Sequence, residues 1–247
     1  MVAFSNVFDV NLSIGRWPFR PYKYDTMDKL VPYLAQFGIT GGLVRSNETA
    51  FSTDIYTDNE ALKAACAAYA RFKALPVVNP AYPLWRDEES SAVLLMPSYQ
   101  NYSLLDGATI DMARALAAKG KRLVVSLREM DERAQHPLCQ VKAPTAEIPG
   151  FAEALPGTPI ILLNGYMGEI PKFTATNLYY DLAFYEPFDL TAAFRALPKG
   201  RMLFGSHAPF FTASAELSKL EDGLTPEEVQ EIALGNATAI GGIVPAP

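Results

Sequence analysis

Residues 8–20, with the sequence FDVNLSIGRWPFR, decide how the rest of this chain is interpreted. The stretch begins as a short apolar run and carries Asn11 and Ser13 two positions apart near the end of that run. Alternate residues of a strand point to the same face, so both polar side chains are expected on one face of a buried strand. A mostly buried strand that ends in polar side chains is typical of a strand that opens on a functional site.

The same pattern recurs along the chain and predicts the fold. Short apolar runs alternate with amphipathic segments, and several of these segments begin at Asp or Thr and end at Gly, as helices do. The apolar runs cover residues 7–15, 40–46, 74–80, 92–99, 122–129, 159–165, 178–184 and 201–208. Eight strand–helix units in about 250 residues predict an α/β fold with a single (β/α)8 TIM barrel. We expect one domain over residues 1–247.

Composition and charge exclude several classes of partner. The chain has 21 Lys and Arg against 27 Asp and Glu, for a net charge of −6, and no basic run, which argues against nucleic acid. No long apolar segment or signal sequence is evident, so we expect a cytoplasmic protein without a membrane partner. No G-x-G-x-x-G follows the first strand, which argues against a dinucleotide. Cys66 and Cys139 are far apart in sequence and are expected to be free thiols.

Polar side chains stand at the end of each predicted strand. The carboxyl ends of barrel strands meet on one face, where the active sites of such barrels lie. Polar residues at these ends therefore predict a shared polar mouth, although each of them could instead hydrogen-bond loop backbone. The residues are Asn11, Ser13, Arg45, Asn79, Tyr99, Gln100, Arg128, Asn164, Asp181, Ser206 and His207.

A set of segments in order along the chain resembles the amidohydrolase superfamily. These are DVNLSIG, VVNP, MPSYQNY, LREMDERAQHP, LLNGY, NLYYDLAF, LFGSHAPFF and NATAI. The resemblance is to the amidohydrolase-related (amidohydrolase 2) branch, which includes decarboxylases and lactonases. It implies a distorted (β/α)8 barrel with a divalent metal. The metal is held by a His-x-His pair on the first strand, by histidines on the fifth and sixth strands, and by an Asp after the eighth.

The sequence departs from that family at each metal-ligand position. Asn11 and Ser13 stand where the His pair of the first strand is expected. Residues 126–128 cover the position of the fifth-strand histidine, and Asn164 stands at the position of the sixth-strand histidine. His207 stands where the Asp after the eighth strand is expected. Gln100 stands where the branch often carries a histidine. We therefore predict that the metal ligands are replaced and that no cofactor is needed. A weak divalent-metal site made of Asp9, Asp181 and His207 is left open.

Two functions follow from these replacements. In the first, the protein is a metal-independent, lactonase-like hydrolase of a small carboxylate-bearing molecule. In it His207 is the base, Asp181 its orienting partner, and Arg45 or Arg128 the anion-binding group. The predicted substrate-binding residues are Arg128, Arg45, Asn11, Ser13, Asn164, Tyr99 and Gln100. In the second, the protein is an inactive pseudoenzyme that binds a small ligand or a partner.

Several residues allow more than one interpretation. Arg45 and Arg128 either bind a ligand anion or form ion pairs with Asp131, Glu129 or Glu48. His136 precedes a proline and is interpreted as a surface or loop-packing residue. The predicted rim of the barrel is rich in aromatic residues, which suit either a small ligand or a subunit interface in a homodimer. The rim residues are Trp17, Phe19, Tyr22, Tyr24, Tyr82, Tyr99, Tyr102 and Tyr166, with Arg16 and Arg20.

Overall fold

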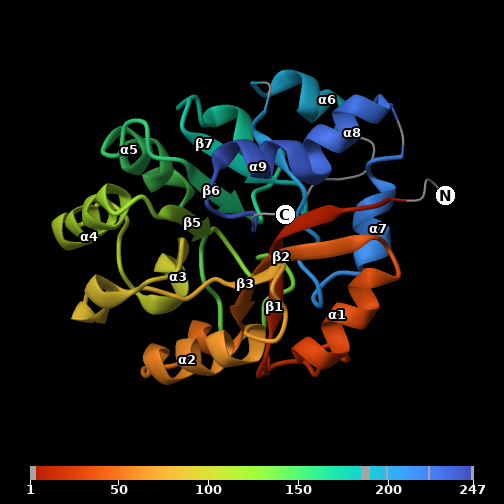
Figure 1. The fold of residues 1–247 in the computed structure, drawn as a ribbon. Helices are drawn as coiled ribbons and strands as arrows, with labels where there is room; N and C mark the ends of the chain where they lie inside the picture. The colour runs from red at the N-terminus through yellow and green to blue at the C-terminus, as the bar shows by residue number, and fades with distance from the viewer. Residues whose placement is uncertain (1–3, 185–189, 199, 222, 246–247) are drawn as a thin grey trace.

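The computed structural model describes residues 4–184, 190–198, 200–221 and 223–245. Within these residues, eight parallel strands are surrounded by helices (Figure 1). The strands are β1 (Val7–Ile14), β2 (Ile39–Ser46), β3 (Phe72–Ala74), β4 (Ala92–Leu95), β5 (Arg122–Ser126), β6 (Ile160–Leu163), β7 (Leu178–Asp181) and β8 (Met202–Leu203). The helices are α1 (Met27–Ala35), α2 (Ile55–Cys66), α3 (Pro97–Gln100), α4 (Gly107–Ala118), α5 (Ile148–Glu153), α6 (Leu190–Ala196), α7 (Ala213–Ser218), α8 (Pro226–Gln230) and α9 (Asn236–Ile240).

Two seams close the strands into a barrel. The strands β1 to β3 form one hydrogen-bonded sheet, and β4 to β8 form another. At one seam the Ser13 N–H donates to the Ala208 carbonyl at 2.9 Å, which joins β1 to the segment after β8. At the other seam the Val78 N–H donates to the Leu94 carbonyl at 2.9 Å, which joins the segment after β3 to β4. The predicted (β/α)8 barrel is confirmed.

Layers of side chains fill the barrel. One cluster of apolar residues draws on every strand or the residues beside it, including Phe8, Leu43, Val77, Leu94, Val124, Ile161, Tyr179 and Leu203. Two residues farther along β2, β5 and β7 stand Arg45, Ser126 and Asp181. Because alternate strand residues share a face, these polar side chains form the next layer toward the carboxyl ends. The strands thus supply an apolar floor under a polar layer.

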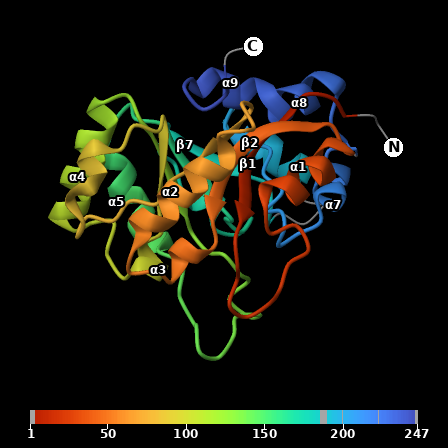
Figure 2. The same cartoon turned by 60° about the horizontal axis from the view of Figure 1, so that its bottom comes forward.

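The helix α9 closes the amino-terminal end of the barrel. Ala237 and Ile240 of α9 belong to the same apolar cluster as the barrel interior. Arg122 donates from Nε to the carbonyls of Ile240 and Gly241, at 3.1 Å each. Figure 2 shows α8 and α9 at the end opposite the long loops that follow β1 (red) and β5 (green). The carboxyl end and its loops are therefore where the site is to be found.

Two predicted strands end elsewhere because of prolines. The third strand was expected over residues 74–80, whereas β3 ends at Ala74 and Val77 forms only an isolated bridge with Leu94. Pro76 has no N–H to donate to a neighbouring strand, so it interrupts the ladder. The fourth strand was expected to reach residue 99, but Pro97 begins the short helix α3.

None of the helices in the described parts of the chain is long and apolar enough to cross a membrane.

Gly205 allows the end of β8 to approach its neighbours closely. A Cβ at this position would lie 2.8 Å from both Cβ and Oδ2 of Asp181, and 3.0 Å from Cβ of Asn11. Side chains packed in a core do not tolerate such distances without a shift of the backbone. The glycine therefore lets the residues after β8 come within hydrogen-bonding distance of the polar layer.

Substitution of Gly205 tests this close approach. We expect Gly205→Ala to lower the free energy of unfolding by about 1–3 kcal/mol, because the added methyl group overpacks a dense region. Chemical denaturation measures the change. Gly107→Ala is the control, because a Cβ there meets nothing within 4 Å and the position is the exposed start of α4. Equal effects of the two substitutions would show that Gly205 is not required by packing.

Candidate functional site

A layer of buried polar side chains crosses the barrel at the carboxyl ends of the strands, with Asn11 at its centre. Asn11 donates from Nδ2 to Asn164 Oδ1 at 2.6 Å and to Asp181 Oδ2 at 2.5 Å. Its Oδ1 accepts a hydrogen bond from Nη1 of Arg45 at 2.5 Å. All four residues are at most 1% exposed. The predicted convergence of polar strand ends is therefore present, and Asn11 connects β1 with β2, β6 and β7.

Arg45, next to Asn11, is a buried cation of this layer. Its Nη2 donates to Glu129 Oε2 at 2.5 Å and to His207 Nδ1 at 3.1 Å. Both members of the ion pair have side chains that are 1% exposed, so each compensates a charge that would be costly to bury alone. Ser126 donates from Oγ to the other carboxylate oxygen of Glu129 at 2.7 Å. The pair therefore fastens the start of the loop after β5 to β2.

The hydrogen bonds of His207 fix one tautomer of its ring. An arginine N–H can only donate, so Nδ1 of His207, which faces Arg45, accepts and carries no proton. A carbonyl can only accept, so Nε2, which lies 2.9 Å from the Glu129 carbonyl, carries the proton. Burial and the neighbouring Arg45 charge lower the pKa of His207 well below its usual value. The ring is neutral and both of its nitrogens are engaged.

The predicted contact between Asp181 and His207 is wrong. The two oxygens of Asp181 accept from the Asn164 N–H at 2.8 Å and from Nδ2 of Asn11. The ring of His207 is oriented instead by Arg45 and by the Glu129 carbonyl. A general base must offer a free lone pair to the substrate, and His207 is 0% exposed with its lone pair directed at Arg45. This geometry does not favour the predicted role of His207 as base.

Two carboxyl groups of the layer have pKa values near neutrality. Burial raises the pKa of Asp181 to about 7, against hydrogen bonds from Asn11 and Asn164, and the nearby Asp9 carboxylate adds to the increase. Burial also raises the pKa of Asp9 to about 6, and hydrogen bonds from Ser206 and from the Asn11 N–H partly offset this effect. The layer therefore takes up protons as the pH falls from 7 to 6.

Arg128 is a second buried arginine, and it pairs away from the centre. Its two terminal nitrogens lie 2.9 and 2.6 Å from the two carboxylate oxygens of Glu169, a bidentate arrangement. Nη1 also donates to the Asn164 carbonyl at 2.6 Å, and the guanidinium lies 3.8 Å from the centroid of the Tyr166 ring. Its acidic partners are Glu169 and, at 3.4 Å, Glu132, rather than the acids named from the sequence. Arg128 therefore holds the segment after β6 and presents no free face to an anion.

Three more predicted site residues lie beside this network. The hydroxyl of Tyr99 accepts from the Glu129 N–H at 3.2 Å. Gln100 donates from Nε2 to the Thr49 carbonyl at 2.5 Å and so fastens α3 to the segment after β2. The hydroxyl of Ser13 is buried and has no hydrogen-bond partner among the described residues. Of the three, only Tyr99 contacts a member of the polar layer.

The backbone at two of the strand ends is in the left-handed region. Asn164 has φ of +63° and His207 has φ of +54°. Asparagine adopts this conformation readily, whereas histidine does so at a cost of about 1 kcal/mol. The bonds from His207 to Arg45 and to the Glu129 carbonyl hold it there. Backbone strain of this kind is concentrated at functional sites.

The side chains of the polar layer do not fit a divalent metal. In the described part of the chain, no group of three or more His, Cys, Asp or Glu side chains is arranged to hold a metal ion. Asn11 directs its amide nitrogen at Asp181 and its oxygen at Arg45. The guanidinium lies beside Nδ1 of His207 and would repel a second cation at that distance. The weak site considered for Asp9, Asp181 and His207 is therefore not assembled.

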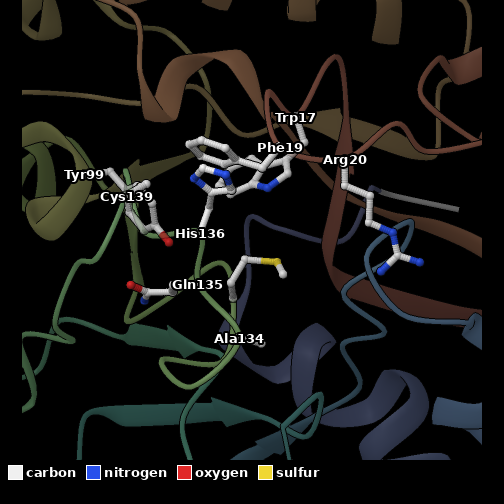
Figure 3. Close-up of a pocket in the computed structure, with 9 residues that line it drawn as sticks. Trp17, Phe19, Arg20, Tyr99, Ala134, Gln135, His136 and Cys139 are labelled. Atoms are coloured by element: carbon white, nitrogen blue, oxygen red, sulfur yellow. The ribbon is translucent and has the colours of Figure 1, made fainter.

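An aromatic cavity of about 320 Å³ lies at the mouth of the barrel. Its walls come from the loops after β1, β4 and β5 and include Trp17, Phe19, Arg20, Tyr99, Met130 and His136. The rings of Phe19 and His136 are stacked, with centroids 4.6 Å apart and an interplanar angle of 12°. Figure 3 shows these stacked rings between Tyr99 on one side and Arg20 on the other. The cavity presents flat aromatic surfaces with a cationic group at the edge.

Aromatic rings separate this cavity from the polar layer. Trp17 lines the cavity, and its ring centroid lies 5.1 Å from that of Phe210. Phe210 in turn stacks on His207, with centroids 4.6 Å apart and an interplanar angle of 18°. The ring of Tyr99 lies 6.3 Å from Trp17 and completes the partition. A molecule in the cavity would therefore meet aromatic faces before it met the ion pair of Arg45.

Sequence reasoning gave too little weight to two residues. Glu129 was considered only as an alternative partner of Arg45, yet its carboxylate, carbonyl and N–H contact Arg45, His207 and Tyr99. An acidic residue directly after an apolar strand was the available signal. His136 is interpreted from the sequence as a surface or loop-packing residue, and in the structure it is exposed and stacks on Phe19. Its place in the cavity wall is what the sequence did not indicate. Nothing in the periodicity of the loop indicated that placement.

Comparison with known proteins supports the fold. No protein-family profile matches the chain, and no curated protein sequence matches it. Among solved structures, 5-carboxyvanillate decarboxylase from Sphingomonas paucimobilis is 14% identical with a TM-score of 0.76, over 97% of this chain and 99% of that one. A dihydroxybenzoic acid decarboxylase from Polaromonas sp. JS666, with bound manganese and the inhibitor 2-nitroresorcinol, is 16% identical with a TM-score of 0.69, over 96% and 97%.

A hydrolase has the same architecture. A probable 2-pyrone-4,6-dicarboxylic acid hydrolase from Acinetobacter baumannii, with citric acid bound, is 11% identical with a TM-score of 0.68, over 96% of this chain and 100% of that one. The chain therefore has the barrel fold of these decarboxylases and hydrolases. The resemblance to the amidohydrolase superfamily is confirmed at the level of the fold.

The Arg45–Glu129 pair can be tested by removing one charge. We expect Glu129→Gln to lower the free energy of unfolding by about 3–5 kcal/mol, because it leaves the buried Arg45 charge uncompensated. Urea denaturation gives the value. Asp131→Asn is the matched control from the same loop, since Asp131 pairs with Arg133, whose side chain is 88% exposed. The control should lose less than about 1 kcal/mol. A similarly small loss for Glu129→Gln would contradict the proposed importance of the pair.

The raised pKa of Asp181 predicts a pH-dependent stability. The folded state holds this proton up to about pH 7, whereas an unfolded aspartate releases it near pH 4. The contribution of Asp181 to the free energy of unfolding is therefore full below about pH 4 and is lost as the pH rises to about 7. Relative to Asp181→Asn, the wild type should lose up to about 4 kcal/mol over this range.

Denaturation at several pH values between about 4 and about 8 measures this difference. The Asp131→Asn variant is again the control, because the pKa of Asp131 is lowered to about 2, mainly by its hydrogen bond with Arg133. Its difference from the wild type should stay constant over the same range. If the Asp181→Asn difference is also constant, the Asp181 carboxyl is not held protonated in the folded protein.

Proposed function

We propose that this protein binds a small, planar organic acid in the aromatic mouth cavity and that the buried polar layer takes no part in turnover. In this proposal the barrel is a pseudoenzyme, a ligand-binding descendant of a hydrolase or decarboxylase. The mouth cavity has about 320 Å³, which lies within the range of small-molecule sites. Aromatic side chains from three segments, those after β1, β4 and β5, come together in its walls.

The closure of the polar layer is the observation that carries the proposal. Arg45, His207 and Asp181 are at most 1% exposed. Apart from Nε of Arg45, which has no hydrogen-bond partner among the described residues, their polar side-chain atoms contact another side chain or backbone within the barrel. A substrate would have to break the Arg45–Glu129 pair to reach these groups, and breaking a buried pair costs several kcal/mol. Binding outside the layer requires no such loss.

The walls of the cavity favour a flat ligand with a negative charge. Phe19, Tyr99 and Trp17 offer ring faces and edges that suit an aromatic or conjugated ring. The guanidinium of Arg20 at the edge can pair with a carboxylate in two parallel hydrogen bonds. The names of the structural neighbours include 5-carboxyvanillate and 2-pyrone-4,6-dicarboxylic acid, both of which are flat rings with carboxylates. They are the first compounds to try.

Metal-independent hydrolysis is the second candidate, and a specific residue favours it. His136 lines the cavity and accepts at Nδ1 from the Leu138 N–H at 3.2 Å, so the proton of its neutral ring lies on Nε2. His136 can donate a proton from this nitrogen to a ligand in the cavity, whereas Cys139 beside it is a poor nucleophile because burial raises the pKa of its thiol. Activity on a lactone would therefore use His136 as a proton donor through Nε2 rather than His207 as a base.

Ligand binding and turnover can be measured on the same samples. Aromatic acids, pyrone lactones and aliphatic carboxylates are titrated into the protein while the fluorescence of Trp17 is followed in the Trp85→Phe variant. We expect saturable quenching by aromatic acids and no product by mass spectrometry. Phe19→Ala should weaken binding at least about tenfold, because it removes one stacking wall. Leu138→Ala is the control, since Leu138 is in the loop after β5 but is 85% exposed.

The outcomes separate the two candidates. Product formation that is lost in His136→Gln would establish the hydrolase and refute the pseudoenzyme. Binding without product, weakened in Phe19→Ala and unchanged in Leu138→Ala, would support a ligand-binding barrel. Absence of binding by all three compound classes would refute the assignment of the cavity.

A further inference from the structure

Three side-chain acceptor atoms from different parts of the barrel converge on the Arg45 guanidinium, and the Leu12 carbonyl adds a longer backbone contact at 3.4 Å. The three side-chain atoms are Oδ1 of Asn11 at 2.5 Å, Oε2 of Glu129 at 2.5 Å and Nδ1 of His207 at 3.1 Å. The guanidinium is thus surrounded by an amide oxygen, a carboxylate oxygen and an imidazole nitrogen. These are the atom types that bind first-row divalent metals in proteins.

Two of the acceptors are as close together as two ligands of one ion. Nδ1 of His207 and Oδ1 of Asn11 are 3.3 Å apart. Two ligand atoms that each lie about 2.1 Å from a tetrahedral metal are separated by about 3.4 Å. Two acceptors without a cation between them have no reason to approach so closely in a buried site, because neither has a proton to donate to the other.

The outer contacts also match those of metal ligands. A metal-binding histidine usually donates its second ring N–H to a backbone carbonyl or a carboxylate, which fixes the tautomer and the ring orientation. His207 does so through Nε2 to the Glu129 carbonyl at 2.9 Å. The Glu129 carboxylate is likewise held by Ser126 at 2.7 Å. Both groups are therefore oriented by contacts additional to those with Arg45.

We propose that the Arg45 guanidinium is a resident cation that has taken the place of a divalent metal. Asn11, Glu129 and His207 form a cation cage, and the positive charge that fills it is part of the chain. Arg45 contributes the charge that holds the three elements together and at the same time excludes a metal ion. This inference stands whether or not the mouth cavity binds an organic acid, because it concerns the closed layer beneath.

Removal of the resident cation is the test. Tag-free Arg45→Ala is dialysed against Zn²⁺ or Mn²⁺ and compared with the wild type by elemental analysis, calorimetry and thermal denaturation. We expect Arg45→Ala to bind about one metal ion per chain, with a Kd for that metal at least about 100-fold below the Kd of the wild type. Its midpoint should rise by about 5–10 °C with the metal at about 100 times Kd. The wild type should show neither change.

Two further variants locate the site. Arg45→Ala combined with His207→Gln lacks the imidazole and should lose the acquired binding at least about tenfold. Arg45→Lys keeps a positive charge in the cage and should bind no more metal than the wild type. Metal binding that survives in the double variant, or that appears equally in Arg45→Lys, would overturn the proposal.

The stability of the variants is also informative. If Arg45→Ala is unfolded without metal, circular dichroism after addition of Zn²⁺ or Mn²⁺ should show recovery of the native spectrum, because the cage would then fold around the ion. Failure of both metals to restore the fold would count against the proposal. A folded Arg45→Ala variant that binds no metal would also overturn it.

Discussion

The buried ion pair between Arg45 and Glu129 is the interaction on which the rest of the site depends. Each charge alone would cost several kcal/mol to bury at 1% exposure, so the two side chains must stay together. Glu129 also contacts His207 through its carbonyl and Tyr99 through its N–H. One pair thereby fixes the tautomer of His207, the start of the loop after β5, and the position of a cavity wall.

The same interaction separates the buried centre of the barrel from its mouth. A neighbour of the same fold holds manganese together with an inhibitor, 2-nitroresorcinol. In the present chain a guanidinium lies at the centre, and the ring of Phe210 stacks on His207 between that centre and the cavity. A charged layer that is closed in this way rigidifies the barrel, and the loops above it remain free to form a binding site. In the proposed function, stability and recognition therefore reside in different layers.

The fold could be predicted from the sequence, whereas the pairing within the site could not. Short apolar runs are local features, so the strands and their polar ends can be predicted one by one. Which polar ends meet depends on the geometry of the whole barrel. The register shift in β1 between Asp9 and Leu12 redirects Asn11, and Asn11 occupies the contact that was expected between Asp181 and His207. The course of a loop, which places His136 in the cavity wall, leaves no periodic signal at all.

The protonation state of His207 tests the central claim most directly, and the chain has only two histidines. Nitrogen-15 NMR of the imidazole rings, with the second signal assigned by His136→Gln, reports tautomer and charge as a function of pH. If Arg45 is the resident cation, His207 of the folded protein is neutral at pH 7 and carries its proton on Nε2. It stays so at every pH above the lowered pKa of its ring. A charged His207 at neutral pH, or a proton on Nδ1, would contradict the account, because neither can accept a hydrogen bond from Arg45.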